Sequence, residues 1–215
     1  MTPSRERSKR KPRWEQSLLA ALAYPANLVL GAVAVLILAL PVVTAFSATI
    51  ALARAFAAWT HNRDDAVFTN TFRQFALTWR RSLPLSIAST GVLVVVAGNI
   101  IFLAMQLANG SDPFGLLIAA AMLPFTLVLL AYALAVAAAS ARIPDATRKE
   151  WVAGGWALLL GLPRRSLGVL TVAIGTGIVS VLIPTMAPFL VFSLPVYAAV
   201  RLWPTAATGE KQDEG

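Results

Sequence analysis

The chain contains no cysteine, so it forms no disulfide and offers no thiolate for catalysis or metal binding. Charged residues are also scarce, at 13% of the 215 residues against about 25% in ordinary soluble domains. The single histidine, His61, lies three residues before Asp64 in a polar stretch, where a solvated loop residue is more common than a catalytic base. We therefore expect no enzyme activity, no metal site and no cofactor.

Apolar residues dominate what is present: 58% of the chain is hydrophobic and the mean hydropathy is +0.71. A soluble core of this size could not bury so much apolar surface, whereas a bilayer accepts it. Open strands would leave backbone groups unpaired in lipid, so the spans are expected to be helices. The sequence thus predicts an all-α polytopic transmembrane bundle over residues 17–203, with a basic tail at 1–16 and a second tail at 204–215. Its six apolar segments lie at about 18–40, 42–58, 84–107, 114–140, 166–183 and 186–203.

The span count has an alternative, because Arg54 interrupts the second segment. A five-span chain would make residues 44–58 a re-entrant or interfacial helix. Prolines mark several boundaries: Pro84 and Pro113 are suited to the first turn of a helix, whereas Pro124 and Pro195 are expected to kink theirs. The first apolar run is longer than the 7 to 15 residues usual for a signal peptide, so we expect it to be retained.

Basic residues fix the predicted orientation. All 18 of them fall in the stretches 1–16, 54–81, 142–165 and 201–215, which lie on one side if the chain crosses six times. By the positive-inside rule that side is the cytoplasm, with both termini inside and a cytoplasmic loop at about 141–165. The high sequence pI of about 10.8 follows from this topology, and no nucleic-acid-binding pattern accompanies it.

The stretch FTNTFRQFALTWRRSL predicts an interfacial amphipathic helix at about residues 66–82. Its aromatic side chains recur at spacings of 4, 3 and 4, which places them on one helix stripe: Phe68, Phe72, Phe75 and Trp79. Aromatic rings facing acyl chains beside arginines facing anionic head groups are ordinary at a membrane surface. The alternative is that the same face docks a partner subunit.

The sequence RRSL occurs twice, from Arg80 to Leu83 and from Arg164 to Leu167, each time before an apolar segment. It indicates either an internal repeat or a repeated topogenic signal. The predicted lipid-contact or docking face of the cytoplasmic side has five arginines: Arg73, Arg80, Arg81, Arg164 and Arg165.

Three amides lie within the apolar segments: Asn27, Asn99 and Gln106. An amide is harder to satisfy from its own helix backbone than a hydroxyl is, so the two asparagines are candidates for hydrogen bonds between helices. The alternative is a neutral solute site lined by all three, in a small-solute carrier or a substrate-binding membrane subunit.

Several short motifs together resemble the YesL-like family of small bacterial membrane proteins. They are Asn27-Leu28, the turn from Leu40 to Thr44, the alanine-rich helix ending near Trp59, and Phe72-Arg73-Gln74-Phe75. The resemblance implies the bacterial cytoplasmic membrane and an auxiliary role in carbohydrate uptake, with ABC transporter subunits as partners beside the lipid bilayer. It implies no catalytic or ligand residues.

Overall fold

The computed structural model describes residues 14–62, 66–108 and 113–203, and every regular element in these ranges is helical. The helices are α1 (Trp14–Leu38), α2 (Ala45–Asn62), α3 (Val67–Ala108), α4 (Pro113–Arg142), α5 (Arg148–Gly161), α6 (Pro163–Leu182), α7 (Ala187–Leu190) and α8 (Ser193–Leu202), with 3-10 turns at Val42–Thr44 and Pro184–Met186. The all-α prediction is confirmed. The predicted tails, up to residue 13 and from residue 204, lie outside the described residues.

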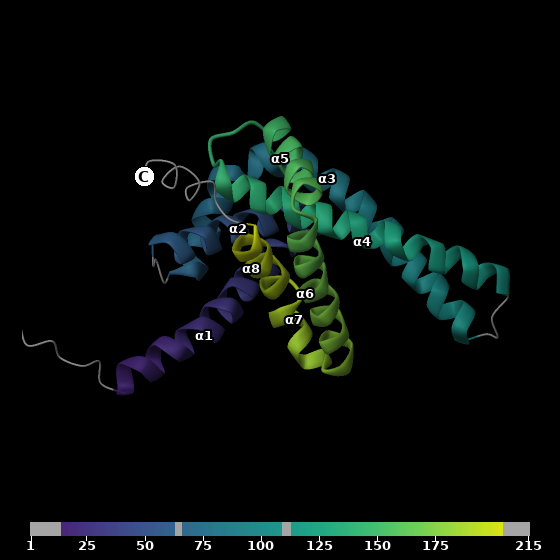
Figure 1. Cartoon of the computed structure of the whole chain (residues 1–215), viewed down its shortest axis with the longest axis horizontal. Helices are drawn as coiled ribbons and strands as arrows, with labels where there is room; N and C mark the ends of the chain where they lie inside the picture. Colours follow the sequence, from purple (N-terminus) through teal and green to yellow (C-terminus); the bar gives the residue numbers. More distant parts are fainter. Residues whose placement is uncertain (1–13, 63–65, 109–112, 204–215) are drawn as a thin grey trace, which may run out of the picture.

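Helix α2 forms the centre of the molecule. It packs against α1, α3, α4 and α8, and its side chains from Ile50 to Phe56 are almost completely buried. Around this hub, three arms diverge: α1, the α3–α4 hairpin and the α6–α7 segment (Figure 1). The core is therefore concentrated at the arm roots, and the outer parts of the arms contribute little to it.

Helix α3 differs from its prediction. The expected helix start at Pro84 is wrong, because α3 runs unbroken through Pro84 for 42 residues and joins the predicted interfacial segment to the following apolar segment. An interior proline removes one backbone hydrogen bond. Here Ser82 and Ser86, on either side of Pro84, are both buried and hydrogen-bonded to α2, and this packing offsets the loss.

Pro113 and Pro195 behave as predicted. Helix α4 begins at Pro113. The last apolar segment is bent by 42° between α7 and α8, at the residues that precede Pro195. Because Pro195 has no N–H to donate to the carbonyl of Val191, four residues earlier, the helix breaks there.

Within the described ranges, four helices are long and apolar enough to cross a membrane, and the bent α7–α8 segment would make a fifth. The four are α2, α3, α4 and α6. The part of α1 with described side chains, Leu22–Leu38, is apolar but shorter. The predicted loop at 141–165 is mostly helical, because it contains the 14 residues of α5.

Candidate functional site: the basic end of the hub

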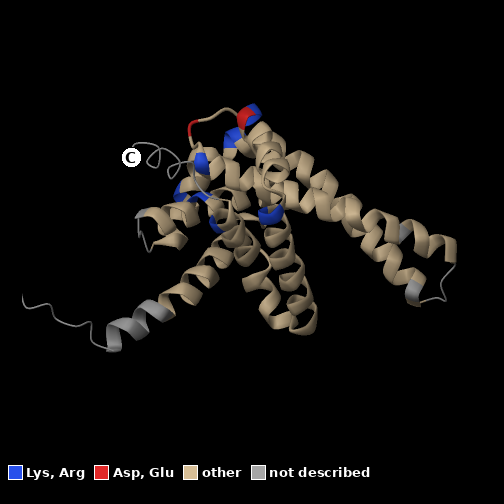
Figure 2. Cartoon of the chain, viewed as in Figure 1, with Lys and Arg blue, Asp and Glu red and all other residues tan. Residues whose placement is uncertain are grey.

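Charged side chains of the described residues gather where the arms meet, in a region that we call the basic end. Lys and Arg lie around the hub and α5, and the outer parts of the α3–α4 and α6–α7 arms carry none (Figure 2). The sequence has no charged residue from Ser82 to Ala108, from Pro113 to Ala141 or from Ser166 to Val200. The fold therefore separates a basic end from apolar arms.

A seam of small polar residues joins α2 to α3 at this end. The Ser82 hydroxyl donates to Ser47 Oγ at 2.9 Å, and the Ser47 backbone N–H donates to Ser86 Oγ at 3.2 Å. Thr71 and Thr78, also buried, donate to carbonyls of their own helix at 2.8 and 2.7 Å. Short hydroxyl side chains let the two backbones approach closely and still satisfy their polar atoms.

Two arginines hold the link between α4 and α5, in an arrangement we call the arginine clamp (Arg54, Arg81 and Trp151). Arg54 donates from Nη2 to the carbonyl of Pro144 at 3.0 Å, and Arg81 donates from Nη1 to the carbonyl of Ala146 at 2.9 Å. Both guanidinium groups also lie over the Trp151 ring, at 4.9 and 5.8 Å from its centroid.

The clamp explains how a positive charge is tolerated in α2. Arg54 is only 8% exposed, and a buried charge needs compensating dipoles. The Pro144 carbonyl and the π-face of Trp151 supply part of this compensation, while the Arg54 Nε atom has no hydrogen-bond partner in the described structure. The clamp thereby fixes the beginning of α5 to the hub.

Helix α5 is fixed along its length as well. Thr147 and Glu150 form a capping box at its start, which satisfies two orphan backbone donors. The Trp151 indole N–H donates to the carbonyl of Ile143 at 3.1 Å. At Gly155 the α4 backbone approaches so closely that an added Cβ would lie 3.1 Å from the backbone nitrogen of Val136. The helix is thus held as a rigid part of the basic end.

The predicted aromatic stripe is present on α3, but it is not the outermost face. Phe68, Phe72 and Phe75 are half-buried and Trp79 is 38% exposed. The Phe68 and Phe72 rings lie 5.1 Å apart, and Phe75 packs against the hub core. The stripe therefore lies between the buried seam and an exposed face.

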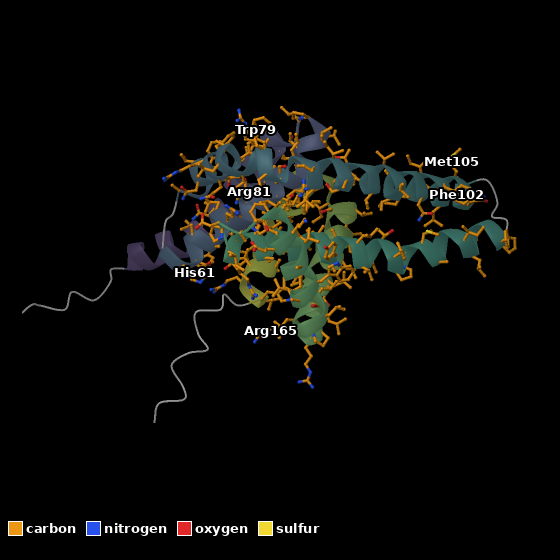
Figure 3. The ribbon with its side chains drawn as sticks, turned by 90° about the horizontal axis from the view of Figure 1, so that it is seen from above. His61, Trp79, Arg81, Phe102, Met105 and Arg165 are labelled. Carbon is orange, nitrogen blue, oxygen red and sulfur yellow. The ribbon has the colours of Figure 1, made fainter. Side chains whose placement is uncertain are left out.

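The five predicted arginines do not form one surface. Arg73 and Arg80 are exposed on the outer side of α3, and Arg80 lies over the Trp79 ring at 5.4 Å. Arg81 instead belongs to the clamp. Arg164 and Arg165 are exposed in the first turn of α6, and Figure 3 shows Arg165 on a different side of the molecule from Arg81.

The three amides are not brought together either. Asn27 is 5% exposed in α1, whereas Asn99 and Gln106 lie in the outer half of α3, and α1 leaves the hub on the side away from that arm (Figure 1). The Gln106 side chain lies against Gly115 of α4, since a Cβ there would be 2.8 Å from Gln106 Nε2. Gln106 of α3 thus contacts α4.

Comparisons with known proteins assign the chain to no family: no family model, no curated protein and no solved structure matches it. Among the described residues, no group of three or more His, Asp or Glu side chains is placed to hold a metal ion.

Sequence reasoning missed the arginine clamp. The available signals were Arg54 within an apolar segment and the T-x-x-E pattern of Thr147 and Glu150, which marks a helix start just before Trp151. Neither signal says that Arg54 and Trp151 meet, because they are almost a hundred residues apart in the sequence.

Proposed function

We propose that the chain is an integral membrane accessory subunit of a bacterial carbohydrate importer of the ABC type, with both termini in the cytoplasm. The importer part of this proposal comes from the resemblance of the Leu40–Thr44 turn and the Phe72–Phe75 motif to the YesL-like family. The structural observation that supports an accessory role is the division between exposed apolar arms and a basic end.

The arms are suited to being surrounded by other molecules. No residue from Ile87 to Gln106 in α3 is buried, although this stretch includes Val94 and Val95, which are 65% and 71% exposed. Soluble monomers rarely expose apolar patches of more than a few hundred Å². An open groove of about 390 Å³ on α6 is likewise lined only by apolar residues and a glycine, from Ile174 to Leu182.

The contact with a cytoplasmic partner is assigned to the outer side of α3. Arg73 and Arg80 are seven residues apart on one exposed face, with Leu77, which is 71% exposed, between them. A basic face around an apolar residue fits an acidic partner surface with its own apolar centre. Arg81 is unsuited to this role because the clamp already uses its guanidinium.

The test is affinity purification from native membranes in mild detergent, followed by mass spectrometry. We expect the permease or ATPase subunits of a carbohydrate importer in stoichiometric amounts. The double variant Arg73→Glu and Arg80→Glu should lose them, and the matched variant Arg73→Lys and Arg80→Lys should keep them, with equal amounts of each protein in the membrane. Purification of the wild-type chain alone, with a ligand that raises its melting temperature, would instead support a solute carrier.

A further inference from the structure

The length of helix α3 and its charge pattern indicate how deep the molecule lies in a membrane. At 1.5 Å per residue its 42 residues extend about 63 Å, twice the roughly 30 Å of the hydrocarbon layer. Its first part carries Arg73, Arg80 and Arg81, and the part from Ser82 to Ala108 has no charge. Only the second part is therefore suited to the hydrocarbon.

Helix α2 lies beside the first part of α3. Its first turn contacts α3 through the hydrogen bonds of Ser47 with Ser82 and Ser86, and the rest of α2 runs back toward the start of α3. The preceding turn between α1 and α2 contacts α3 at Val42, whose carbonyl accepts from the Thr90 hydroxyl at 3.4 Å. Between Thr90 and Ala108 α3 continues for about 27 Å.

From the positions at which α2 and the α1–α2 turn contact α3, we infer that the α3–α4 arm crosses the bilayer with its surface against acyl chains. We also infer that α2 does not cross. The part of the arm beyond Thr90 is almost as long as the hydrocarbon is thick. If the α1–α2 turn lay at the outer surface, as six spans require, this uncharged and unburied part would project into water.

Burial and charge agree with this assignment. More than half of the apolar stretch of α2 is buried by protein, at 56%, whereas the corresponding stretch of α3 has none buried and that of α4 has 12%. Protein packing thus accounts for the apolar composition of α2. The basic residues also stay on one side, because α1 and α2 move no charged segment across the membrane when they lie at its cytoplasmic surface. There the exposed apolar side chains of α1, such as Leu22 and Leu30, can enter the membrane interface.

The absence of native cysteine permits a direct test in the full chain with single cysteines at exposed positions: Leu40→Cys in the α1–α2 turn, Phe114→Cys at the outer end of the arm, and Lys149→Cys in α5. An impermeant maleimide applied to intact cells should label position 114 and neither of the others. After permeabilisation it should also label position 149. Labelling of position 40 in intact cells, or failure of position 114 to label there, would overturn the inference.

A second measurement tests what surrounds the arm. A nitroxide on Val94→Cys, in the protein reconstituted into phosphatidylcholine and phosphatidylglycerol vesicles, should collide frequently with oxygen and rarely with a water-soluble nickel complex. Rare collisions with both would mean that another protein, such as a second copy, covers the arm, and frequent collisions with nickel would mean water. Either result would contradict the lipid assignment. This inference depends on membrane insertion and not on the importer, so the purification and the labelling can fail independently.

Discussion

The close approach of α5 to α4 makes Gly155 a sensitive position. In Gly155→Ala the new methyl group would lie 2.6 Å from Val136 Cγ2, and 3.1 and 3.2 Å from the backbone nitrogen and Cα of the same residue. Two of these atoms belong to the α4 backbone, and a valine methyl in a helix has little rotamer freedom. The conflict therefore cannot be relieved by moving the end of a flexible side chain.

The expected magnitude follows from two opposing terms. Overpacking a tight contact costs about 1–3 kcal/mol, and replacing glycine with alanine inside a helix contributes about 1 kcal/mol in the other direction. Because the neighbouring atoms are stiff, we expect the cost near the upper end of its range. The net destabilisation should be about 1–2 kcal/mol, which corresponds to a fall of about 2–8 °C in melting temperature for a chain of this size.

Gly91→Ala is the matched control. It makes the same chemical change inside α3, where an added Cβ meets no atom within 4 Å, so only the favourable helix term remains. Thermal unfolding of both purified variants in one detergent, followed by tryptophan fluorescence, should show a lower melting temperature for Gly155→Ala and an equal or higher one for Gly91→Ala. The reasoning is refuted if Gly155→Ala is as stable as the wild type, or if both variants lose stability equally.

Substitutions at Arg81, Ser82 and Trp151, with Arg80 as a control position, test the hub in the same unfolding assay. Arg81→Ala removes the carbonyl hydrogen bond and ring contact of the clamp and should cost about 1–2 kcal/mol of stability. Its control, Arg80→Ala, loses one surface ring contact and should cost about 0.5 kcal/mol. Equal losses of stability in these two variants would contradict the clamp. Ser82→Ala removes the hydroxyl that joins α2 and α3 and should cost about 1 kcal/mol, and an unchanged melting temperature would show that the seam contributes nothing. Trp151→Phe keeps a ring under the arginines but loses the indole hydrogen bond, which should cost about 1 kcal/mol of stability. Trp151→Ala also removes the ring and should cost about 3–5 kcal/mol. The same loss of stability in both variants would mean that the ring is unimportant.

Features with a local cause were predictable from the sequence. Pro113 begins α4 and Pro195 follows the break between α7 and α8, because a missing N–H acts within four residues of the proline. The helical spacing of Phe68, Phe72, Phe75 and Trp79 also held, since it depends only on the helix period.

Features that depend on contacts between distant segments were not predictable. Pro84 carries the same local signal as Pro113, yet α3 continues through it because Ser82 and Ser86 bind α2. The role of Arg81 depends in the same way on α5, which brings Trp151 beneath its guanidinium. The charge pattern of the sequence identified a basic side, but only the fold shows that the clamp uses Arg81 and not its neighbour Arg80.

The continuity of α3 through Pro84 has a mechanical consequence. The same helix bears the exposed Arg73 and Arg80 in its first part and the outer tip of an arm at its other end. Because Ser82 and Ser86 hold the first part to α2, the hub and α3 tilt together as one lever. From Pro84 to Ala108 the lever is about 36 Å long, and a tilt of about 5° there moves the tip by about 3 Å. A protein that pulls on the arginine face would therefore shift the opposite end of the arm without any change in the helix between them.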